Sequence, residues 1–423
     1  MNKKSILLIF SIVLMICFLT ACGNGETSIQ TNVEQQKENV DTSIQTESDE
    51  PEGLSNTTSE IAAVSEKVET LEIETREIKE TSLPEPVEIS LIMVGDILLH
   101  TRVEEGAVQE DGTYNYDAIF APMKSEIESA DLALVNQEVI IGGEEIGVSA
   151  YPCFNAPFEM GDALVDAGFD VVCHATNHAL DKGKKGLLNC VQFWKTDYPD
   201  IAVLGIYETA QEQEEIYVYE QDGIKIAILN YTYGTNGIAL PQDMPFAVDL
   251  LQEEKVIADI QKAEEIADFT IVCPHWGTEY VLKQTKEQER WAQLFLENGV
   301  DLVLGTHPHV IEPIEMLVDE ETGNEMLVYY SIGNFVNWTS ESGKGKADRM
   351  VGGMAEVTIG LDESGEVAIT DYGVTALVTH LAYGTNGVYT TKLADYTQEL
   401  SLTSEMIHQD ASFSKEYSNC KQG

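Results

Sequence analysis

Val303-Leu304-Gly305-Thr306-His307-Pro308-His309 places two histidines, one residue apart, at the end of an apolar run. The run begins at Val300 and is typical of a short buried strand that ends at Gly305. The two imidazoles therefore lie at the carboxyl edge of a predicted sheet, where open α/β sheets bind ligands. Pro308 fixes its own φ and removes a backbone donor, which stiffens the turn. Histidine is the commonest metal ligand, although His-x-His pairs are also frequent in structural or exposed turns.

Other predicted strands end in residues that can also coordinate a cation. These residues are Asp96 after Val87–Val94, Glu138 after Ala133–Val135, Asn177 with His178 after Phe169–Cys173, and His275 after Phe269–Cys273. A turn, a cap or a buried structural histidine explains any one of them, but explains the repetition poorly. If the strands form a layered α/β sheet, these ends converge on one face. Carboxylates, an amide and several imidazoles suit two divalent ions of the manganese, zinc or iron kind.

Several further residues are expected to border this site. Asp181 follows His178 by three residues, so the two side chains share a helical face and the carboxylate can fix the imidazole tautomer. His100 follows Asp96 by four residues and is a candidate for the same crevice. Other candidate site-lining residues are Asn136, Glu279 and Asn334. His174, which falls within or beside its strand, is interpreted as a structural histidine.

The chain alternates helical and strand patterns, which predicts an α/β fold. Predicted helices cover 119–129, 158–168, 185–194, 250–267, 284–297 and 395–408. Further strands are expected at 202–205, 326–335, 352–359 and 367–372, and a hairpin at 216–229 turns at Gln221-Asp222-Gly223. The loop Tyr231–Gly237 is a candidate wall of the cleft.

The composition excludes a generic attraction to nucleic acid. The 423 residues carry 73 acidic and 24 basic side chains, a formal net charge of -49. Such a chain is repelled by phosphate backbones and by anionic lipid headgroups. An anionic substrate therefore needs bound or local cations to draw it in, and Lys182, Lys184 and Lys185 beside His178 are candidates.

The N-terminus predicts a lipoprotein. Two lysines, Lys3 and Lys4, precede the apolar run Ile6–Leu19, which is short for a membrane span and typical of a secretory signal. The run ends in Leu19-Thr20-Ala21-Cys22-Gly23, which resembles a bacterial lipobox. Cleavage after residue 21 would leave Cys22 as a lipidated terminus on the extracytoplasmic face of the cell membrane, and a diacylated cysteine anchors stably. The alternative is a plain signal peptide in which Cys22 has no role.

Four segments follow from this pattern: a signal peptide at 1–21, an acidic linker at 22–87, one large domain at 88–410 and a tail at 411–423. The linker is rich in Glu, Thr, Ser, Gln and Asn up to about Pro86, and we expect it to be disordered because it cannot bury a core. The mature cysteines include no Cys-x-x-Cys pair, and Cys173 and Cys273 are expected to be small buried apolar residues.

The ordered motifs resemble those of the CapA family of poly-γ-glutamate capsule synthesis proteins. The resemblance rests on Gly95-Asp96, Asn136-x-Glu138, Ala175-Thr176-Asn177-His178-Ala179-Leu180-Asp181-x-Gly183, His275-Trp276-Gly277-x-Glu279-Tyr280, Gly305-Thr306-His307-Pro308-His309-Val310 and Ser331-Ile332-Gly333-Asn334-Phe335. The family is similar to calcineurin-like metallophosphatases. The resemblance therefore implies a four-layer α/β/β/α sandwich, with two sheets between helices, preceded here by the linker.

The same resemblance implies roles for the candidate ligands. Asp96 and His309 would bind one metal, while Asn177, His275 and His307 would bind the other, with Glu138 bridging the two. His178 would act as general acid or transition-state donor, oriented by Asp181. Metallophosphatases usually begin with Asp-x-His, but this chain has Asp96-Ile97-Leu98, so His100 is a candidate replacement. The bridging carboxylate is also a glutamate rather than an aspartate.

Two classes of function are compatible with these patterns. The first is a surface metal-dependent hydrolase that acts on a phosphoester or on an amide of an anionic envelope polymer. The second is a non-catalytic factor that binds the capsule polymer or its membrane synthase and assists synthesis or export.

Overall fold

A computed structural model describes residues 87–339, 341–362, 364–381, 387–402 and 409. These residues belong to one of two compact units, residues 80–423. The predicted signal peptide with Cys22, the linker up to residue 86 and the tail lie outside the described residues. Within the described part, no helix is both long and apolar enough to cross a membrane.

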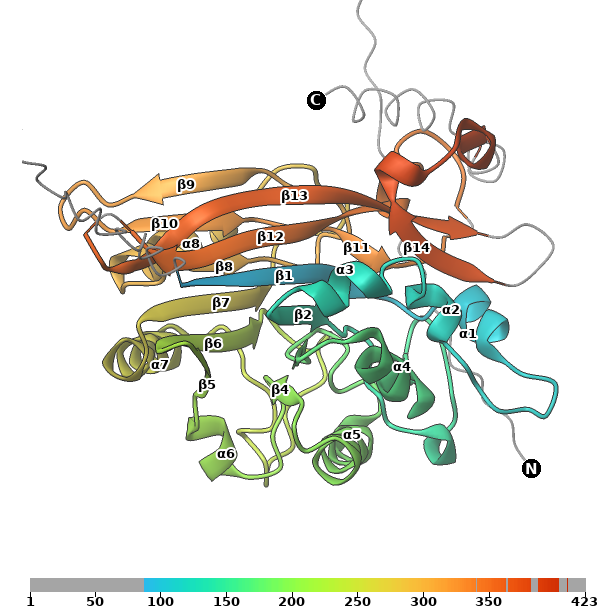
Figure 1. The fold of residues 1–423 in the computed structure, drawn as a ribbon. Helices are drawn as coiled ribbons and strands as arrows, with labels where there is room; N and C mark the ends of the chain where they lie inside the picture. The colour runs from blue at the N-terminus through green and yellow to red at the C-terminus, as the bar shows by residue number, and fades with distance from the viewer. Residues whose placement is uncertain (1–86, 340, 363, 382–386, 403–408, 410–423) are drawn as a thin grey trace, which may run out of the picture. The chain divides into compact units, whose positions relative to one another are not determined.

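Two β-sheets form the centre of the fold (Figure 1). The eight-stranded sheet runs in the order β14 (Val388–Lys392), β13 (Val367–Leu381), β12 (Val351–Leu361), β1 (Glu88–Ile97), β2 (Leu132–Asn136), β3 (Val171–Cys173) and β4 (Ala202–Leu204), and β11 (Asn334–Val336) also pairs with β1. The six-stranded sheet runs β5 (Tyr217–Gln221), β6 (Ile224–Thr232), β7 (Phe269–His275), β8 (Leu302–Leu304), β10 (Glu325–Tyr329) and β9 (Ile314–Val318). Strands β1 to β4 are mutually parallel, as are β6, β7, β8 and β10. The carboxyl ends of the parallel strands in each sheet therefore share one edge.

Helices flank the sheets. They are α1 (Thr101–Ala107), α2 (Asp117–Phe120), α3 (Lys124–Ser129), α4 (Glu159–Ala167), α5 (Gly183–Asp197), α6 (Ala210–Glu214), α7 (Glu253–Ile266) and α8 (Lys286–Glu297), with 3₁₀ turns η1 (Glu144–Ile146), η2 (Ala347–Met350) and η3 (Leu393–Asp395). Helix α4 ends where Gly168 adopts a left-handed conformation with φ 99°, as its sequence predicts. Helix α8 begins with a capping box in which Thr285 and Gln288 bond each other's backbone N–H.

Strand residues alternate between two apolar cores, which defines four layers. Ile89, Leu91 and Met93 of β1 face the six-stranded sheet and pack in the core between the sheets. Ile92 and Val94 face the opposite way, into the core shared with α2 to α5. A third core lies between the six-stranded sheet and helices α7 and α8. The predicted α/β/β/α sandwich is therefore confirmed.

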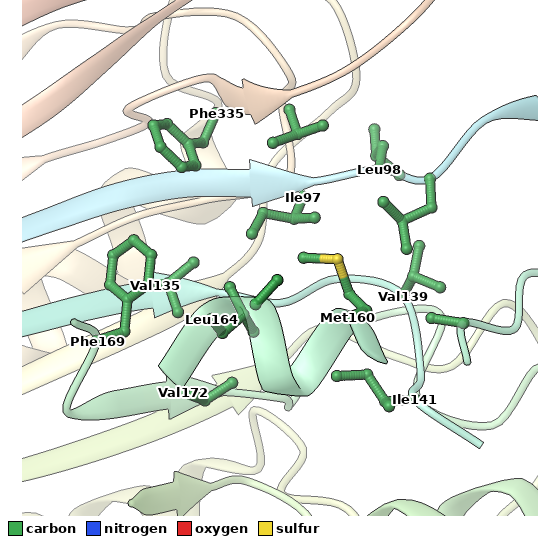
Figure 2. Close-up of a cluster of buried hydrophobic side chains, with 14 of the residues drawn as sticks. Ile97, Leu98, Val135, Val139, Ile141, Met160, Leu164, Phe169, Val172 and Phe335 are labelled. Carbon is green, nitrogen blue, oxygen red and sulfur yellow. The ribbon is translucent and has the colours of Figure 1, made fainter. Parts of the chain in front are cut away.

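The core on the α4 side supports the strand ends that carry the acidic site residues (Figure 2). Ile97 and Val139 follow Asp96 and Glu138 in sequence, and both are fully buried near Met160 of α4. Because their side chains fill a packed core, the strand ends cannot shift without opening cavities. The neighbouring carboxylates are therefore held on a rigid base.

Several predicted elements differ from the structure. The helix predicted at 119–129 is two short helices, α2 and α3, and the strand predicted at 326–335 is divided into β10 and β11. Gly333 has φ 69° at this break, where the chain passes from one sheet to the other. Of the predicted terminal helix, residues 398–402 are helical and 403–408 lie outside the described residues. Strands β9 and β14 and helices α1 and α6 were not predicted.

Candidate metal centre

Three polar residues lie side by side across the eight-stranded sheet. The strand register places Asp96 of β1 between Asn136 of β2 and Asn334 of β11. The Asn136 amide donates to Asp96 Oδ1 at 2.8 Å. Gly95 permits this arrangement, because a Cβ at that position would lie 1.9 Å from the Gly333 carbonyl oxygen. The Gly95-Asp96 motif thus brings a buried carboxylate to the junction of three strands.

Glu138 is the most isolated acidic group of the site. It is 0% exposed, and neither carboxylate oxygen has a hydrogen-bond partner among the described residues. Its Oε1 lies 3.8 Å from Nε2 of each of three histidines, His178, His275 and His309. Burial raises the pKa of Glu138 well above its ordinary value. A buried carboxylate with no protein donor is costly unless a cation neutralises it, so Glu138 fits the predicted bridging ligand.

His275 and Asn177 connect the two sheets. His275 ends β7, and its Nε2 lies 3.0 Å from Asn177 Oδ1 in the loop after β3. Its other ring nitrogen, Nδ1, lies 3.0 Å from Thr306 Oγ1. The hydroxyl therefore fixes the ring orientation, as outer partners of metal ligands commonly do.

His307 and His309 both adopt left-handed backbone conformations, with φ of 97° and 60°. Such conformations are unfavourable for non-glycine residues and concentrate at functional sites. His309 Nδ1 lies 3.0 Å from Asp96 Oδ2 and 3.1 Å from Asn334 Oδ1. Because both neighbours are acceptors, Nδ1 carries a proton, and Nε2, which lies 3.8 Å from Glu138 Oε1, is the nitrogen that would bind a metal once it is deprotonated. His307 Nδ1 is buried and has no hydrogen-bond partner among the described residues.

The ligand atoms form three overlapping groups, each within 4.8 Å. They are Asp96 with Glu138 and His309, Glu138 with His275 and His307, and Glu279 with His307 and His309. The first two correspond to the two ligand sets that the family resemblance implies, and Glu138 belongs to both. Nitrogen and carboxylate donors with unpartnered buried atoms fit divalent zinc, manganese or iron.

His100 is the predicted candidate replacement for the histidine that an Asp-x-His motif would supply. No group found in the described part of the chain includes His100. Its ring instead packs edge-on against Phe154, with the centroids 5.4 Å apart. Glu279, predicted only as a lining residue, is the additional carboxylate beside His309.

His178 lies at the edge of the centre, and Asp181 and Phe154 hold its ring in place. Asp181 Oδ2 accepts from His178 Nδ1 at 2.6 Å and from the Phe154 backbone N–H at 2.7 Å. Phe154 also packs edge-on against the His178 ring, with the centroids 4.7 Å apart. The Nε2 atom therefore faces Glu138, where it can give or take a proton.

Electrostatics separate four of the histidines at or near the centre. Burial, together with neighbouring imidazoles, lowers the pKa of His275 and His307 well below the ordinary value, so both rings are neutral ligands. Burial alone would also lower the pKa of His309, but the charges of Glu138 and Asp96 raise it to about 9. For His100, burial and then the charges of His309, His178 and Arg349 lower the pKa to about 4.

Sequence reasoning missed Asn230 and indicated Asn236 only as part of the Tyr231–Gly237 loop. Asn230, buried in β6, accepts from the Ala175 backbone N–H at 2.7 Å and donates to the Cys273 carbonyl at 2.8 Å, which ties β3, β6 and β7 together. Asn236 contacts Asn177 and His178 at 3.3 and 3.4 Å. The available signal for Asn230 was an amide within an otherwise apolar strand.

Two half-exposed tyrosines, Tyr233 and Tyr280, form part of the rim of the candidate metal centre. The ring of Tyr233, in the loop predicted to line the cleft, lies 4.6 Å from that of His307. The Tyr280 ring lies 5.8 Å from that of His309. Each tyrosine therefore covers one member of the opening histidine pair.

The proposed lysine cluster beside His178 is largely neutralised. Lys184 pairs with Asp243, and Lys185 pairs with Glu145. Lys184 and Lys185 are therefore weaker candidates for attracting an anion than the sequence suggests.

Other polar and sulfur-containing residues have structural roles. His174 is buried, and its Nε2 accepts from the Trp194 indole N–H at 3.1 Å, as expected of a structural histidine. Cys173 and Cys273 are buried free thiols in the core between the sheets.

The four layers and the clustered donors define a class of protein: an α/β/β/α sandwich with a candidate metal centre at the carboxyl edges of both sheets. The sequence model of the family "Bacterial capsule synthesis protein PGA_cap" matches residues 90–339. That match covers more than half of the chain, and the chain belongs to this family, as its motifs predict.

Two curated relatives carry related names. The chain is 27% identical over 263 residues to "Capsule biosynthesis protein CapA" of Bacillus anthracis, covering 59% of this chain and 61% of the relative. It is 29% identical over 257 residues to "PGA biosynthesis protein CapA" of Bacillus subtilis (strain 168), covering 59% and 64%. The matches span about three fifths of each relative.

Solved structures with a distant likeness include phosphoester-cleaving enzymes by name. The NAD nucleotidase NadN of Haemophilus influenzae has a TM-score of 0.44 and 14% identity over 70% of this chain and 58% of its own. Purple acid phosphatase PPD1 of yellow lupin has a TM-score of 0.33 and 10% identity, covering 73% and 54%. The family assignment rests on the sequence match rather than on these likenesses.

Proposed function

We propose that this CapA-type protein acts in the synthesis or export of capsular poly-γ-glutamate through a metal-dependent hydrolase site. Its relatives' names refer to capsule and PGA biosynthesis. The observation that carries the proposal is the isolated Glu138 carboxylate, surrounded by three imidazole nitrogens at 3.8 Å. A buried anion with this surrounding has the chemistry of a bridging metal ligand.

Asp96, Glu138 and His309 would hold one divalent ion, and Glu138, Asn177, His275 and His307 would hold the other. Bound ions supply Lewis acidity and a nucleophile from water at neutral pH. The protein's own contribution is the placement of His178. Its Nδ1 proton is held by Asp181, so its Nε2 is positioned to protonate the leaving oxygen or nitrogen of a phosphoester or amide.

A non-catalytic scaffold is the second candidate, and one observation favours it. Leu98 stands where an Asp-x-His motif would supply a histidine, and His100 lies outside the ligand groups of the described residues. One ion would then be held with fewer ligands, and the site would bind polymer or a membrane synthase without turnover.

We also propose that the protein is a lipoprotein anchored through Cys22 on the extracytoplasmic face of the membrane. The support is the lipobox-like Leu19-Thr20-Ala21-Cys22 after an apolar run. Membrane-associated lipid labelling in the wild type should disappear in Cys22→Ala. Normal labelling of Cys22→Ala would contradict the anchor.

His178→Ala separates the hydrolase from the scaffold. The protein with added Mn²⁺ or Zn²⁺ is assayed for metal content and for hydrolysis of a generic phosphodiester and of a γ-glutamyl amide. A hydrolase should lose turnover by roughly 10²–10⁴-fold while keeping its metal, because His178 is placed as the acid rather than as a ligand. Equal turnover in both proteins, or metal-loaded wild type without activity on either substrate, would contradict the hydrolase.

A further inference from the structure

Arg349, at the end of the 3₁₀ turn η2, lies at the rim of the candidate centre. Its guanidinium carbon is 3.4 Å from the centroid of the Tyr280 ring, which in turn lies beside His309. The stacked ring restricts the guanidinium to one plane, so the charge is already oriented. Arg349 was not among the residues that the sequence motifs indicated.

The backbone of Arg349 is tied to the same ligands. Asn334 donates from Nδ2 to the Arg349 carbonyl at 2.8 Å and to the His309 carbonyl at 3.1 Å. Asn337 also donates to the Arg349 carbonyl, at 3.1 Å. One asparagine therefore positions both the imidazole of His309 and the turn that carries the arginine.

Within the described residues, only some of the Arg349 guanidinium N–H groups have a hydrogen-bond partner. One guanidinium nitrogen pairs with Glu341 Oε2 at 3.1 Å, while Nε is buried and has no hydrogen-bond partner. Its side chain is 13% exposed, whereas that of Glu341 is 54% exposed. The other arginines described, Arg102 and Arg290, pair with glutamates on helix surfaces. Arg349 is therefore the arginine that combines a preorganised position, an unused donor and a place beside the centre.

We propose that Arg349 binds an oxyanion group of the substrate, a carboxylate or a phosphate, beside the metal centre. A planar guanidinium matches two oxygens of such a group. This assignment rests on the proposed function for the substrate itself, and it explains how a chain of net charge -49 attracts an anion. Glu341 occupies the guanidinium until the substrate oxyanion displaces it.

Calorimetric titration of Mn²⁺-loaded protein tests this assignment. The probes are inorganic phosphate and a γ-linked glutamate dipeptide, and the variants are Arg349→Met, Arg349→Lys and Glu341→Gln. Arg349→Met should weaken binding of at least one probe roughly tenfold or more, since a charged hydrogen bond is lost. Arg349→Lys should recover part of the affinity, and Glu341→Gln should tighten binding because the competing anion is gone.

Arg290→Met is the matched control. Arg290 also stacks on an aromatic ring, Trp291 at 4.5 Å, and pairs with Glu253 and Glu287, but it lies on α8. Its variant should bind both probes like the wild type. A loss confined to the dipeptide in Arg349→Met identifies a carboxylate as the ligand, a loss confined to phosphate identifies a phosphate, and a loss of both identifies a shared oxyanion site.

Metal content on the same samples separates this inference from the proposed function. Wild type that holds no metal would overturn both. Metal-loaded wild type that binds neither probe, or that binds both exactly as Arg349→Met does, would overturn only the role of Arg349. An unchanged or weaker affinity in Glu341→Gln would contradict the competition between Glu341 and the substrate.

Discussion

The aspartates at the amino ends of the parallel strands and Glu138 at the carboxyl ends have opposite surroundings. At the amino ends, an aspartate stands immediately before each of four strands, β2, β3, β7 and β8. These aspartates are Asp131, Asp170, Asp268 and Asp301. Each accepts a hydrogen bond from a backbone N–H of the adjacent strand, at 2.9, 2.9, 2.8 and 2.7 Å respectively. At the carboxyl ends, the Glu138 carboxylate has no partner among the described residues.

The difference shows that an aspartate or glutamate next to a strand does not by itself indicate a ligand. An acid whose oxygens accept backbone bonds stabilises the sheet. An acid that is buried without donors lowers stability and is retained for another reason. The absence of protein donors therefore distinguishes Glu138 from these four aspartates, and the following variants test that distinction. Asp96, the other candidate acidic ligand, does accept from the Asn136 amide and the His307 backbone N–H.

Glu138→Gln should have the largest effect, and it should fall on the metal. We expect metal affinity to drop by more than roughly 100-fold, because a shared ligand is lost, whereas outer partners alone account for about 10–100-fold. Without metal, the variant should be as stable as the wild type or more stable, since it lacks a carboxyl whose ionisation is penalised by burial without donors. Calorimetric metal titration and chemical unfolding measure the two effects. A variant that binds metal normally would contradict the bridging role.

Asn334→Ala should weaken metal binding by about 10–100-fold, the range typical of residues that orient a ligand. Asn334 positions the His309 ring through Oδ1 and the His309 backbone through Nδ2. The same metal titration measures the change. Wild-type affinity in this variant would show that His309 is held without Asn334.

Asp301→Ala should lower the free energy of unfolding by about 1–3 kcal/mol, because the Thr270 N–H loses its acceptor in a largely buried setting. Metal content should stay at the wild-type level. Urea unfolding and metal analysis of the same preparation measure both quantities. If Asp301→Ala lost metal but kept its stability, Asp301 would be a functional acid rather than a structural one, which would contradict the distinction.

Asp301 should also contribute a pH dependence. Burial raises the pKa of its carboxyl from 3.8 to about 7. Between these values the folded state holds a proton that the unfolded state has released, so this group's contribution to stability falls as the pH rises from about 4 to about 7. The stability difference between wild type and Asp301→Asn should change across that window. A difference that is constant with pH would contradict the raised pKa.

The sequence predicted the parts of the site that depend on local pattern. Apolar runs followed by Asn177, His275 or His307 identify strand ends, and their shared edge follows from parallel pairing. Asn334 was predicted to line the site, but its pairing beside Asp96 was not, because that pairing depends on the chain leaving one sheet at Gly333 and joining β1 of the other. The sequence pattern of residues 326–335 was interpreted as one continuous strand and gave no indication of that crossing.

For a similar reason, Arg349 was not predicted, and Glu279 was predicted only as a lining residue. Both gain their significance from contacts across long sequence separations: Arg349 with Tyr280, and Glu279 with His307 and His309. The left-handed conformations of His307 and His309 also depend on their surroundings rather than on local preference. The order of residues along the chain does not show which distant residues are in contact.

Metal analysis of purified wild type against His307→Ala tests the candidate centre most directly. His174→Gln is the histidine control, because His174 accepts from Trp194 and belongs to none of the ligand groups in the described residues. After loading with Mn²⁺ or Zn²⁺ and removal of free ions, wild type and His174→Gln should retain equal amounts of metal, while His307→Ala should lose at least about half, the share of one ion in a two-metal site. Equal metal content in wild type and His307→Ala would contradict the site.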